Sequence, residues 1–193
     1  MTFDQTIYFL HKLYTMSAIT TIDQLIECFD EAEPSEQVSV LKRIEIPKSE
    51  FKEYATWKKG GYTRNCLARK EGFEFILICW DAGSVTPIHG HGGEDCWVHQ
   101  VSGLVKEKRY KKTSYGFEVT NDATLIEGGL TYMHDRMGYH TIENCTDEPS
   151  MTLHVYASPI DRCKVYNDEK GEFETVEMEY DTIEGREVKK TGS

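Results

Sequence analysis

From Gly60 onward the chain consists of short runs rich in β-branched and aromatic residues, separated by Gly, Asn and Asp. No segment between these runs has helical periodicity, so the runs are expected to pair with one another directly. The pattern predicts strands over residues 62–69, 73–80, 96–110, 116–125, 139–143, 151–156, 164–167 and 173–180. Many short strands without helices between them are typical of a mainly β sandwich or barrel, such as a double-sheet jelly roll.

Residues 1–57 have a different pattern, which predicts helices. Thr21 can cap a helix whose apolar face repeats at helical spacing through Ile22, Leu25, Ile26 and Phe29. A second helix is expected from Pro34, with Val38, Val40, Leu41 and Ile44, and a third from Ser49. We therefore expect one domain, comprising a helical part (1–57), a barrel (60–182) and a polar, frayed tail (184–193).

Composition restricts the partners of this 193-residue chain. It has 33 acidic and 22 basic residues, so its net charge of −11 disfavours nucleic acid and anionic membranes. No run approaches the ~18 apolar residues of a membrane span, and the N-terminal residues do not resemble a signal peptide. The six cysteines contain no Cys-x-x-Cys pair, which favours reduced thiols. A cytoplasmic protein is expected.

His89 and His91 are the first candidates for a metal site. In an extended strand, residues i and i+2 face the same side, so both imidazoles point toward one place. The neighbouring glycines allow the backbone to bend closely around a ligand. Further ligands would come from the remaining histidines, which are His11, His99, His134, His140 and His154. Imidazoles alone do not distinguish zinc, iron, nickel and copper.

The stretch 83–103 resembles the first motif of the cupin superfamily, with Cys96 where that motif has a Glu ligand. Residues 129–144 resemble the second motif in part, although Asp135 and Met137 replace its usual Pro and Gly. The resemblance implies a cupin double-stranded β-helix. It also implies that His140 completes a three-histidine metal site with His89 and His91.

A three-histidine site without a carboxylate is similar to that of the mononuclear iron thiol dioxygenases, and residues 62–178 resemble cysteine dioxygenase. This resemblance implies an Fe(2+) enzyme that oxidises L-cysteine with O2 to L-cysteine sulfinate, within cysteine catabolism and taurine and sulfur metabolism. Three neutral ligands leave the ion's positive charge uncompensated, which favours binding of a thiolate. Glu94 and Asp95 are expected to point away from the ion.

The sequence Tyr62-Thr63-Arg64-Asn65 matches a family tetrad whose Arg binds the substrate carboxylate. A planar guanidinium can make two parallel hydrogen bonds to a carboxylate, so Arg64 is expected to bind substrate with help from Tyr62. Two alternatives remain. Dioxygenases of 3-mercaptopropionate or cysteamine generally lack this Arg, and a non-catalytic metal-binding cupin would not need it.

Thr152, His154 and Tyr156 are expected to share one face of a strand, where they can form a hydrogen-bonded relay. The family has a Ser-His-Tyr relay at this place, followed by a cis peptide bond at the position of Ser158-Pro159. In the family, the Tyr is also joined by a thioether bond to the Cys that replaces the cupin Glu. The resemblance therefore implies a Cys96–Tyr156 cross-link, and a monomer is expected.

Overall fold

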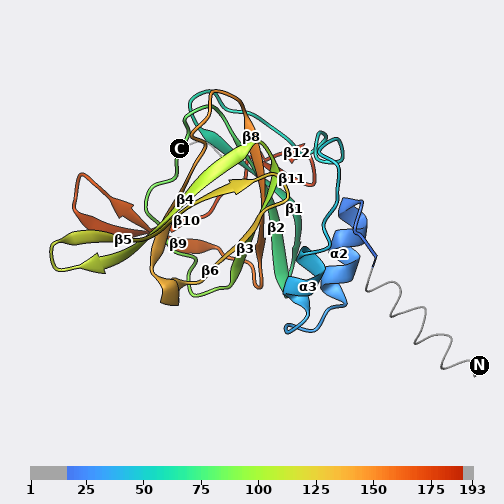
Figure 1. The fold of residues 1–193 in the computed structure, drawn as a ribbon, viewed down its shortest axis with the longest axis horizontal. Helices are drawn as coiled ribbons and strands as arrows, with labels where there is room; N and C mark the ends of the chain where they lie inside the picture. The colour runs from blue at the N-terminus through green and yellow to red at the C-terminus, as the bar shows by residue number, and fades with distance from the viewer. Residues whose placement is uncertain (1–16, 189–193) are drawn as a thin grey trace, which may run out of the picture. The chain divides into compact units, whose positions relative to one another are not determined.

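The computed structural model describes residues 17–188, which form two compact units, 17–50 and 51–188 (Figure 1). In the first unit, α2 (Ile22–Asp30) begins after Thr21, whose hydroxyl accepts a hydrogen bond from the Gln24 amide, as predicted. The second predicted helix is shorter than expected, because α3 spans only Gln37–Leu41 and Ile44 pairs with Ile19 in a β-bridge.

The third predicted helix is wrong, because residues 49–54 form turns. Phe51 is fully buried there, but this segment has no second buried residue one helical turn away, so it has no helical face to bury. Residues 1–16, including His11, lie outside the described residues. None of the described helices is long and apolar enough to cross a membrane.

The larger sheet of the second unit has seven strands in the order β12-β11-β1-β2-β8-β3-β6. Its neighbouring strands are antiparallel, except for the parallel pair β1–β11. The strands span Tyr62–Lys70 (β1), Phe73–Trp80 (β2), Cys96–Ser102 (β3), Leu130–Met133 (β6), Ser150–Tyr156 (β8), Thr182–Ile183 (β11) and Arg186–Glu187 (β12).

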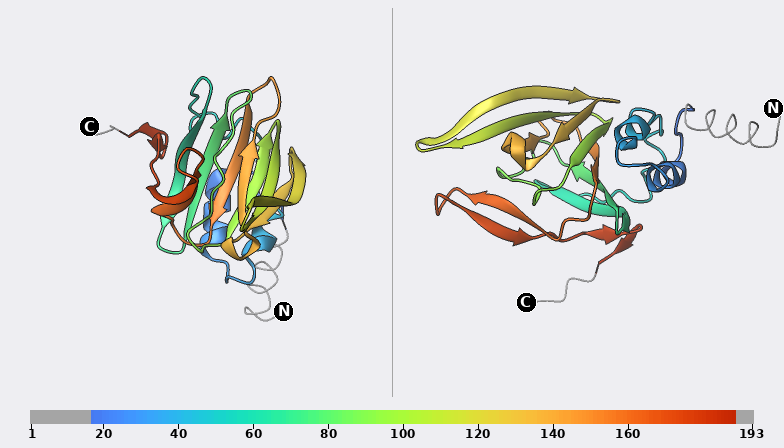
Figure 2. Two further views of the ribbon diagram at one scale, coloured as in Figure 1. Left: turned by 90° about the vertical axis from the view of Figure 1, so that its left-hand side faces the viewer. Right: turned by 90° about the horizontal axis from the view of Figure 1, so that it is seen from below.

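The opposite wall combines a three-stranded sheet, a connecting segment and a hairpin. The sheet has the order β5-β4-β7, and its strands are Leu104–Thr113 (β4), Gly116–Ile126 (β5) and Tyr139–Glu143 (β7). The hairpin consists of β9 (Arg162–Asn167) and β10 (Glu172–Glu177). Single bridges connect residues 85–89 to β7 and to β9, so the wall is continuous. The β4–β5 and β9–β10 hairpins extend from the barrel in the same direction (Figure 2).

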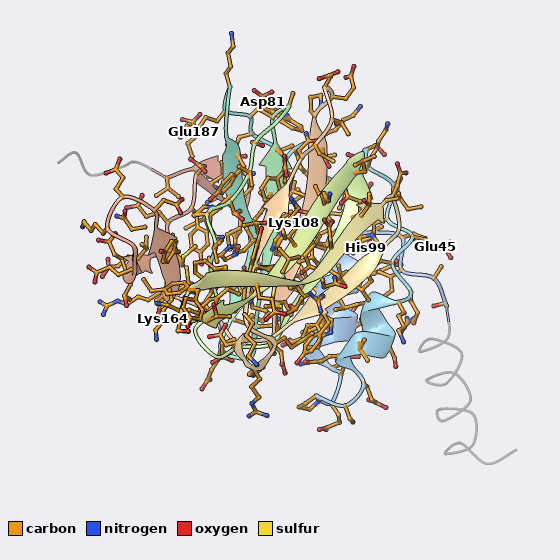
Figure 3. The ribbon with its side chains drawn as sticks, turned by 60° about the vertical axis from the view of Figure 1, so that its left-hand side comes forward. Glu45, Asp81, His99, Lys108, Lys164 and Glu187 are labelled. Atoms are coloured by element: carbon orange, nitrogen blue, oxygen red, sulfur yellow. The ribbon has the colours of Figure 1, made fainter. Side chains whose placement is uncertain are left out.

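This architecture confirms the mainly β jelly roll. Buried side chains from both walls fill its interior, whereas charged residues such as Lys108 and Lys164 lie on outer positions (Figure 3). The buried set is Ile76, Ile78, Trp80, Cys96, Val98, Val105, Leu125, Ile142, Tyr156 and Ile160.

Several strand boundaries differ from the prediction, and β10 ends at Glu177 rather than at residue 180. The run 96–110 is divided at Gly103, which has a φ of 72° and carries the chain from β3 in one wall to β4 in the other. Residues 182–187 form the small β11–β12 hairpin, so residues 184–188 do not belong to the expected tail; residues 189–193 lie outside the described part. The strand β6 was not predicted, because four residues carry too little alternation to be recognised.

Gly138 offers a sharp test of how β7 is placed. It follows the short 3-10 helix η1 (Asp135–Met137) with a φ of 107°, and a Cβ at this position would overlap the carbonyl oxygen of Tyr110 on β4. Gly128 also has a positive φ, 80°, but open space around it. We expect Gly138→Ala to lower the free energy of unfolding by roughly 2 kcal/mol more than Gly128→Ala. Chemical denaturation of both variants would measure this difference, and equal losses would contradict the described packing of β4 against β7.

Candidate metal centre and substrate pocket

Three histidines converge inside the barrel. The ligand nitrogens of His89, His91 and His140 all lie within 4.8 Å of one another. Their positions follow from the backbone, because His89 and His140 exchange two N–H···O hydrogen bonds of 3.0 Å across the junction with β7. The ring centroids of His89 and His91 lie 4.5 Å and 4.6 Å from that of His140. The three predicted ligands are therefore brought together.

Hydrogen bonds orient two of the imidazoles toward the centre of this cluster. The Nδ1 atom of His89 lies 3.0 Å from the carbonyl oxygen of Pro87, and the Nδ1 atom of His140 lies 2.9 Å from Glu107 Oε1. We assign the proton to Nδ1 in both rings, because each oxygen is an acceptor. The two Nε2 atoms then face each other, 3.2 Å apart, with their lone pairs free.

The third ring and the electrostatics both fit a metal ion. Both ring nitrogens of His91 are buried without a hydrogen-bond partner. Leaving buried polar atoms unpaired costs free energy, and a metal ion that binds a nitrogen lone pair would offset part of that cost. Burial lowers the pKa of His89 to about 4 and holds the pKa values of His91 and His140 well below their usual range. All three are neutral at neutral pH, which is the form that binds divalent transition metals.

Glu107 is a residue of this site that the sequence analysis missed. It lies on β4, is 1% exposed, and accepts hydrogen bonds from Arg109 Nη2 (2.9 Å) and Thr131 Oγ1 (3.0 Å) through its second oxygen. Its charge is therefore compensated while its first oxygen holds His140. A carboxylate in this position fixes the tautomer and direction of a metal-binding imidazole. The available signal was an acidic residue at an inward position of β4, but its partner depends on how β4 pairs with β7.

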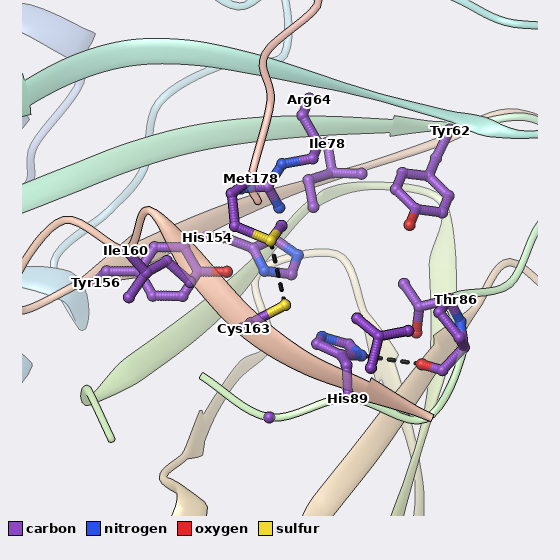
Figure 4. A pocket seen from close by; sticks show the side chains of 13 residues that line it. Tyr62, Arg64, Ile78, Thr86, His89, His154, Tyr156, Ile160, Cys163 and Met178 are labelled. Atoms are coloured by element: carbon purple, nitrogen blue, oxygen red, sulfur yellow. Dashed lines mark hydrogen bonds between the residues drawn. The ribbon is translucent and has the colours of Figure 1, made fainter. Parts of the chain in front are cut away.

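A cavity of about 50 Å³ adjoins the cluster and has no carboxylate in its lining (Figure 4). His89, Tyr62, Arg64, His154 and Tyr156 all line it. The Nε atom of Arg64 donates to the carbonyl oxygen of Glu179 at 3.2 Å, whereas Nη2 is buried without a partner. A buried, unpaired guanidinium nitrogen favours an anionic ligand with oxygen acceptors. Burial raises the pKa of Tyr62, so its phenol stays protonated beside Arg64.

The predicted strand face is present on β8. Thr152 Oγ1 accepts a hydrogen bond from Trp80 Nε1 at 2.8 Å and lies 3.0 Å from His154 Nε2. Burial lowers the pKa of His154 to about 3, which keeps this imidazole neutral. The expected bond from His154 to the hydroxyl of Tyr156 is not found among the described residues, so the relay is connected only through its first two members.

Tyr156 instead contacts Arg64 and Cys96. Burial raises the pKa of its phenol well above the usual value, and the positive charge of Arg64, with a hydrogen bond from it, partly opposes this rise. Cys96 is the direct cross-strand partner of Tyr156 in the β3–β8 register, and its buried thiol hydrogen-bonds to the phenol. The two residues of the implied cross-link are thus neighbours.

Other candidates lie outside the cluster. Glu94 and Asp95 are absent from the group of ligand atoms, and Asp95 accepts a hydrogen bond from the hydroxyl of Tyr132. On β3, His99 alternates with Val98 and so occupies the opposite face, and His134 caps η1. The expected cis bond at Ser158-Pro159 is wrong, because the described peptide bonds are all trans.

Comparisons with known proteins find relatives of this chain in one enzyme family. A family model described as cysteine dioxygenase type I matches residues 10–169, which include the three histidines and Arg64. Cysteine dioxygenase type 1 of Rattus norvegicus is 30% identical over 176 residues, covering 89% of this chain and 88% of the rat protein. The protein of the same name from Homo sapiens is 28% identical over 174 residues, covering 88% and 87%. A Klebsiella pneumoniae structure with a double-stranded β-helix domain aligns at 15% identity with a TM-score of 0.47, covering 65% of this chain and 85% of that one.

The hydrogen bond from His140 to Glu107 leads to a prediction about metal affinity. Glu107→Gln keeps the size of the side chain but removes its charge, so affinity for a divalent ion should fall by about 10–100-fold. His140→Ala should abolish retention. Competition with a chelator, using zinc(II) as a redox-inert probe, would measure both effects. Glu94→Gln is the matched control, and a loss of affinity in this variant would show that a carboxylate binds the ion.

Proposed function

Because this chain belongs to the cysteine dioxygenase type I family, we propose that it oxidises L-cysteine with O2 to L-cysteine sulfinate in an iron(II)-dependent reaction. One observation carries the proposal: the guanidinium of Arg64, with Nη2 unpaired, and the three-histidine cluster border the same small cavity. A ligand there can present a carboxylate to Arg64 and a thiol near the histidines. The reaction belongs to cysteine catabolism and to taurine and sulfur metabolism.

His89, His91 and His140 would hold the iron. Iron(II) bound there would supply the redox chemistry that dioxygen requires. The three neutral imidazoles contribute no negative charge, so they leave the ion strongly attractive to a thiolate. Imidazole ligands alone would also accept zinc or copper, and the choice of iron rests on the family.

The remaining lining residues would orient the substrate. Arg64 supplies guanidinium N–H groups to the carboxylate, and Tyr62 supplies its protonated phenol next to them. Tyr156 stays protonated because of its burial, so its hydroxyl can donate a hydrogen bond to a reacting oxygen. His154 is kept neutral by burial and is held by Thr152 on the same face of β8. Its ring would restrict the positions that the reacting oxygen can take.

Arg64→Ala should separate cysteine from thiols that have no carboxylate. Loss of one partner of a buried charge pair costs roughly 2–5 kcal/mol, so kcat/KM for L-cysteine should fall at least about tenfold. The value for cysteamine, which has no carboxylate to lose a partner, should fall by a clearly smaller factor. Oxygen uptake by iron-loaded protein with L-cysteine, cysteamine and 3-mercaptopropionate would measure these values.

The control for this experiment is Arg162→Ala, which removes an exposed arginine paired with Glu177. Equal losses on cysteine and cysteamine in Arg64→Ala would show that Arg64 is structural. If the wild-type protein has a higher kcat/KM for cysteamine or 3-mercaptopropionate than for L-cysteine, that thiol is the substrate instead of L-cysteine. A protein that binds iron but consumes no oxygen with any of the three thiols would be a non-catalytic cupin.

We also propose that a thioether bond forms between Cys96 and Tyr156 during turnover. Formation of the bond removes the thiol hydrogen and one ring hydrogen, with dioxygen as the acceptor of the two electrons. The bond would hold the phenol in place, which lowers the cost of orienting it. All six cysteines are unpaired in the structure, so Cys96 is free to react.

Unpaired thiols also support a reducing, cytoplasmic compartment. The monomeric state stays a prediction.

Purified protein should contain two species, one lighter by two hydrogens, after turnover with iron, cysteine and oxygen. Intact-mass spectrometry and denaturing gels would detect them. Cys96→Ser should give one species and reduced but measurable activity. Cys163→Ser, which removes a cysteine that lines the cavity, should still give two species. A single uncross-linked species after prolonged wild-type turnover would rule out the bond.

A further inference from the structure

A C-terminal segment lies along the strand that carries Arg64. Residues 178–182, here called the strap, run beside β1. The amide of Asp181 donates to the carbonyl oxygen of Arg64 at 2.8 Å, and the amide of Arg64 donates to Asp181 Oδ2 at 2.9 Å. Thr182 then begins β11, which pairs with Asn65 of β1. The strap is therefore fixed to the backbone of Arg64.

The strap also holds the side chain of Arg64. The carbonyl oxygen of Glu179 accepts the hydrogen bond from Arg64 Nε, while Met178 lines the cavity next to the guanidinium (Figure 4). Because the guanidinium is planar and rigid, an acceptor held at Nε fixes the rotation of the whole group. Nη2, which shares an edge of the group with Nε–H, is buried without a partner. The position of one carbonyl group thus sets the direction of the predicted carboxylate-binding group.

Tyr180 fastens that carbonyl group to the interior. Its hydroxyl donates to Oε1 of Glu74, a β2 residue that is 0% exposed, and accepts from Arg69 Nη1 at 2.5 Å. The ring packs against the buried core of the barrel. On the other side of Glu179, the amide of Met178 donates to the carbonyl oxygen of Asp161 at 2.8 Å. Glu179 therefore lies between two residues that are attached to the barrel, Met178 and Tyr180. Of these two, Tyr180 is attached through its side chain, to the buried carboxyl group of Glu74.

We propose that Tyr180 is a positioning residue that sets the preference for a thiol with a carboxylate. Through Glu74 it holds the strap, the strap holds the Nε atom of Arg64, and Arg64 presents Nη2 to the substrate. The identity of the substrate in this inference rests on the proposed function. The structural part, that Tyr180 fixes the orientation of the Arg64 guanidinium, does not depend on it. A hydroxyl that merely stabilised the fold would affect all substrates alike.

Tyr180→Phe keeps the ring and removes the hydroxyl. With iron-loaded protein, KM for L-cysteine should rise by about fivefold, with kcat for L-cysteine and both constants for cysteamine changing less than twofold. Tyr132→Phe is the matched control, because it removes another phenol that donates to a carboxylate, that of Asp95. Equal changes for the two thiols, or no change for cysteine, would overturn the proposal.

A second measurement does not depend on metal or turnover. In metal-free protein, the Nε–H resonance of Arg64, identified by its loss in Arg64→Lys, should shift and exchange faster with water in Tyr180→Phe. Glu74→Gln, which keeps the hydrogen-bond acceptor for Tyr180 but removes its charge, should give a smaller shift in the same direction and serves if Tyr180→Phe does not fold. An unchanged resonance in the folded variants overturns the proposal. Failure of the wild type to oxidise cysteine, with the resonance shifted as expected, overturns the proposed function instead.

Discussion

The site depends on one backbone contact, the pair of hydrogen bonds between His89 and His140. Together with a bridge between Val85 and Glu143, it attaches residues 85–89 to β7, and a further bridge from His89 reaches Val165 of β9. The same contact therefore helps to complete the smaller wall of the barrel and brings the Nε2 atoms of His89 and His140 to 3.2 Å from each other. His91 follows two residues later and enters the same space. The bridge between His89 and His140 therefore fixes the relative positions of the cluster's histidines at the edge of the cavity.

Charge is distributed unevenly around the cavity. Glu107 is close to the cluster, but Arg109 compensates its charge, and burial keeps the histidines and His154 neutral. Arg64 remains as the cation among the lining residues, with one nitrogen unpaired. A small anion therefore finds a favourable partner at one end of the cavity and, with a metal bound, at the other. This arrangement suits a ligand with two anionic groups separated by a short carbon chain.

The two walls contribute differently to such a ligand. The larger sheet supplies Arg64 and Tyr156, which line the cavity and lie in the fixed registers of β1 and β8. The smaller wall supplies the histidines, whose backbone runs through a connecting segment and β7. The strap, residues 178–182, adds a third contribution by holding Arg64 from outside. Orientation at the site thus comes from three parts of the chain that are far apart in sequence.

Local patterns in the sequence determined much of this protein. Alternation on one strand placed Thr152, His154 and Tyr156 on a common face, and the His-x-His spacing placed His89 beside His91, because side-chain direction in a strand depends only on neighbouring residues. The family resemblance, also available from the sequence, identified His140 and Arg64. Tertiary structure alone decided what those side chains meet. Glu107 became the partner of His140, and Tyr180 the anchor near Arg64, because pairing between distant strands, which no local pattern encodes, sets the contacts across a barrel. The same reason applies to the continuous β-rich run that Gly103 divides. Its two halves pair in different sheets, β3 beside β8 and β6, and β4 beside β5 and β7, and the run itself does not encode those partners.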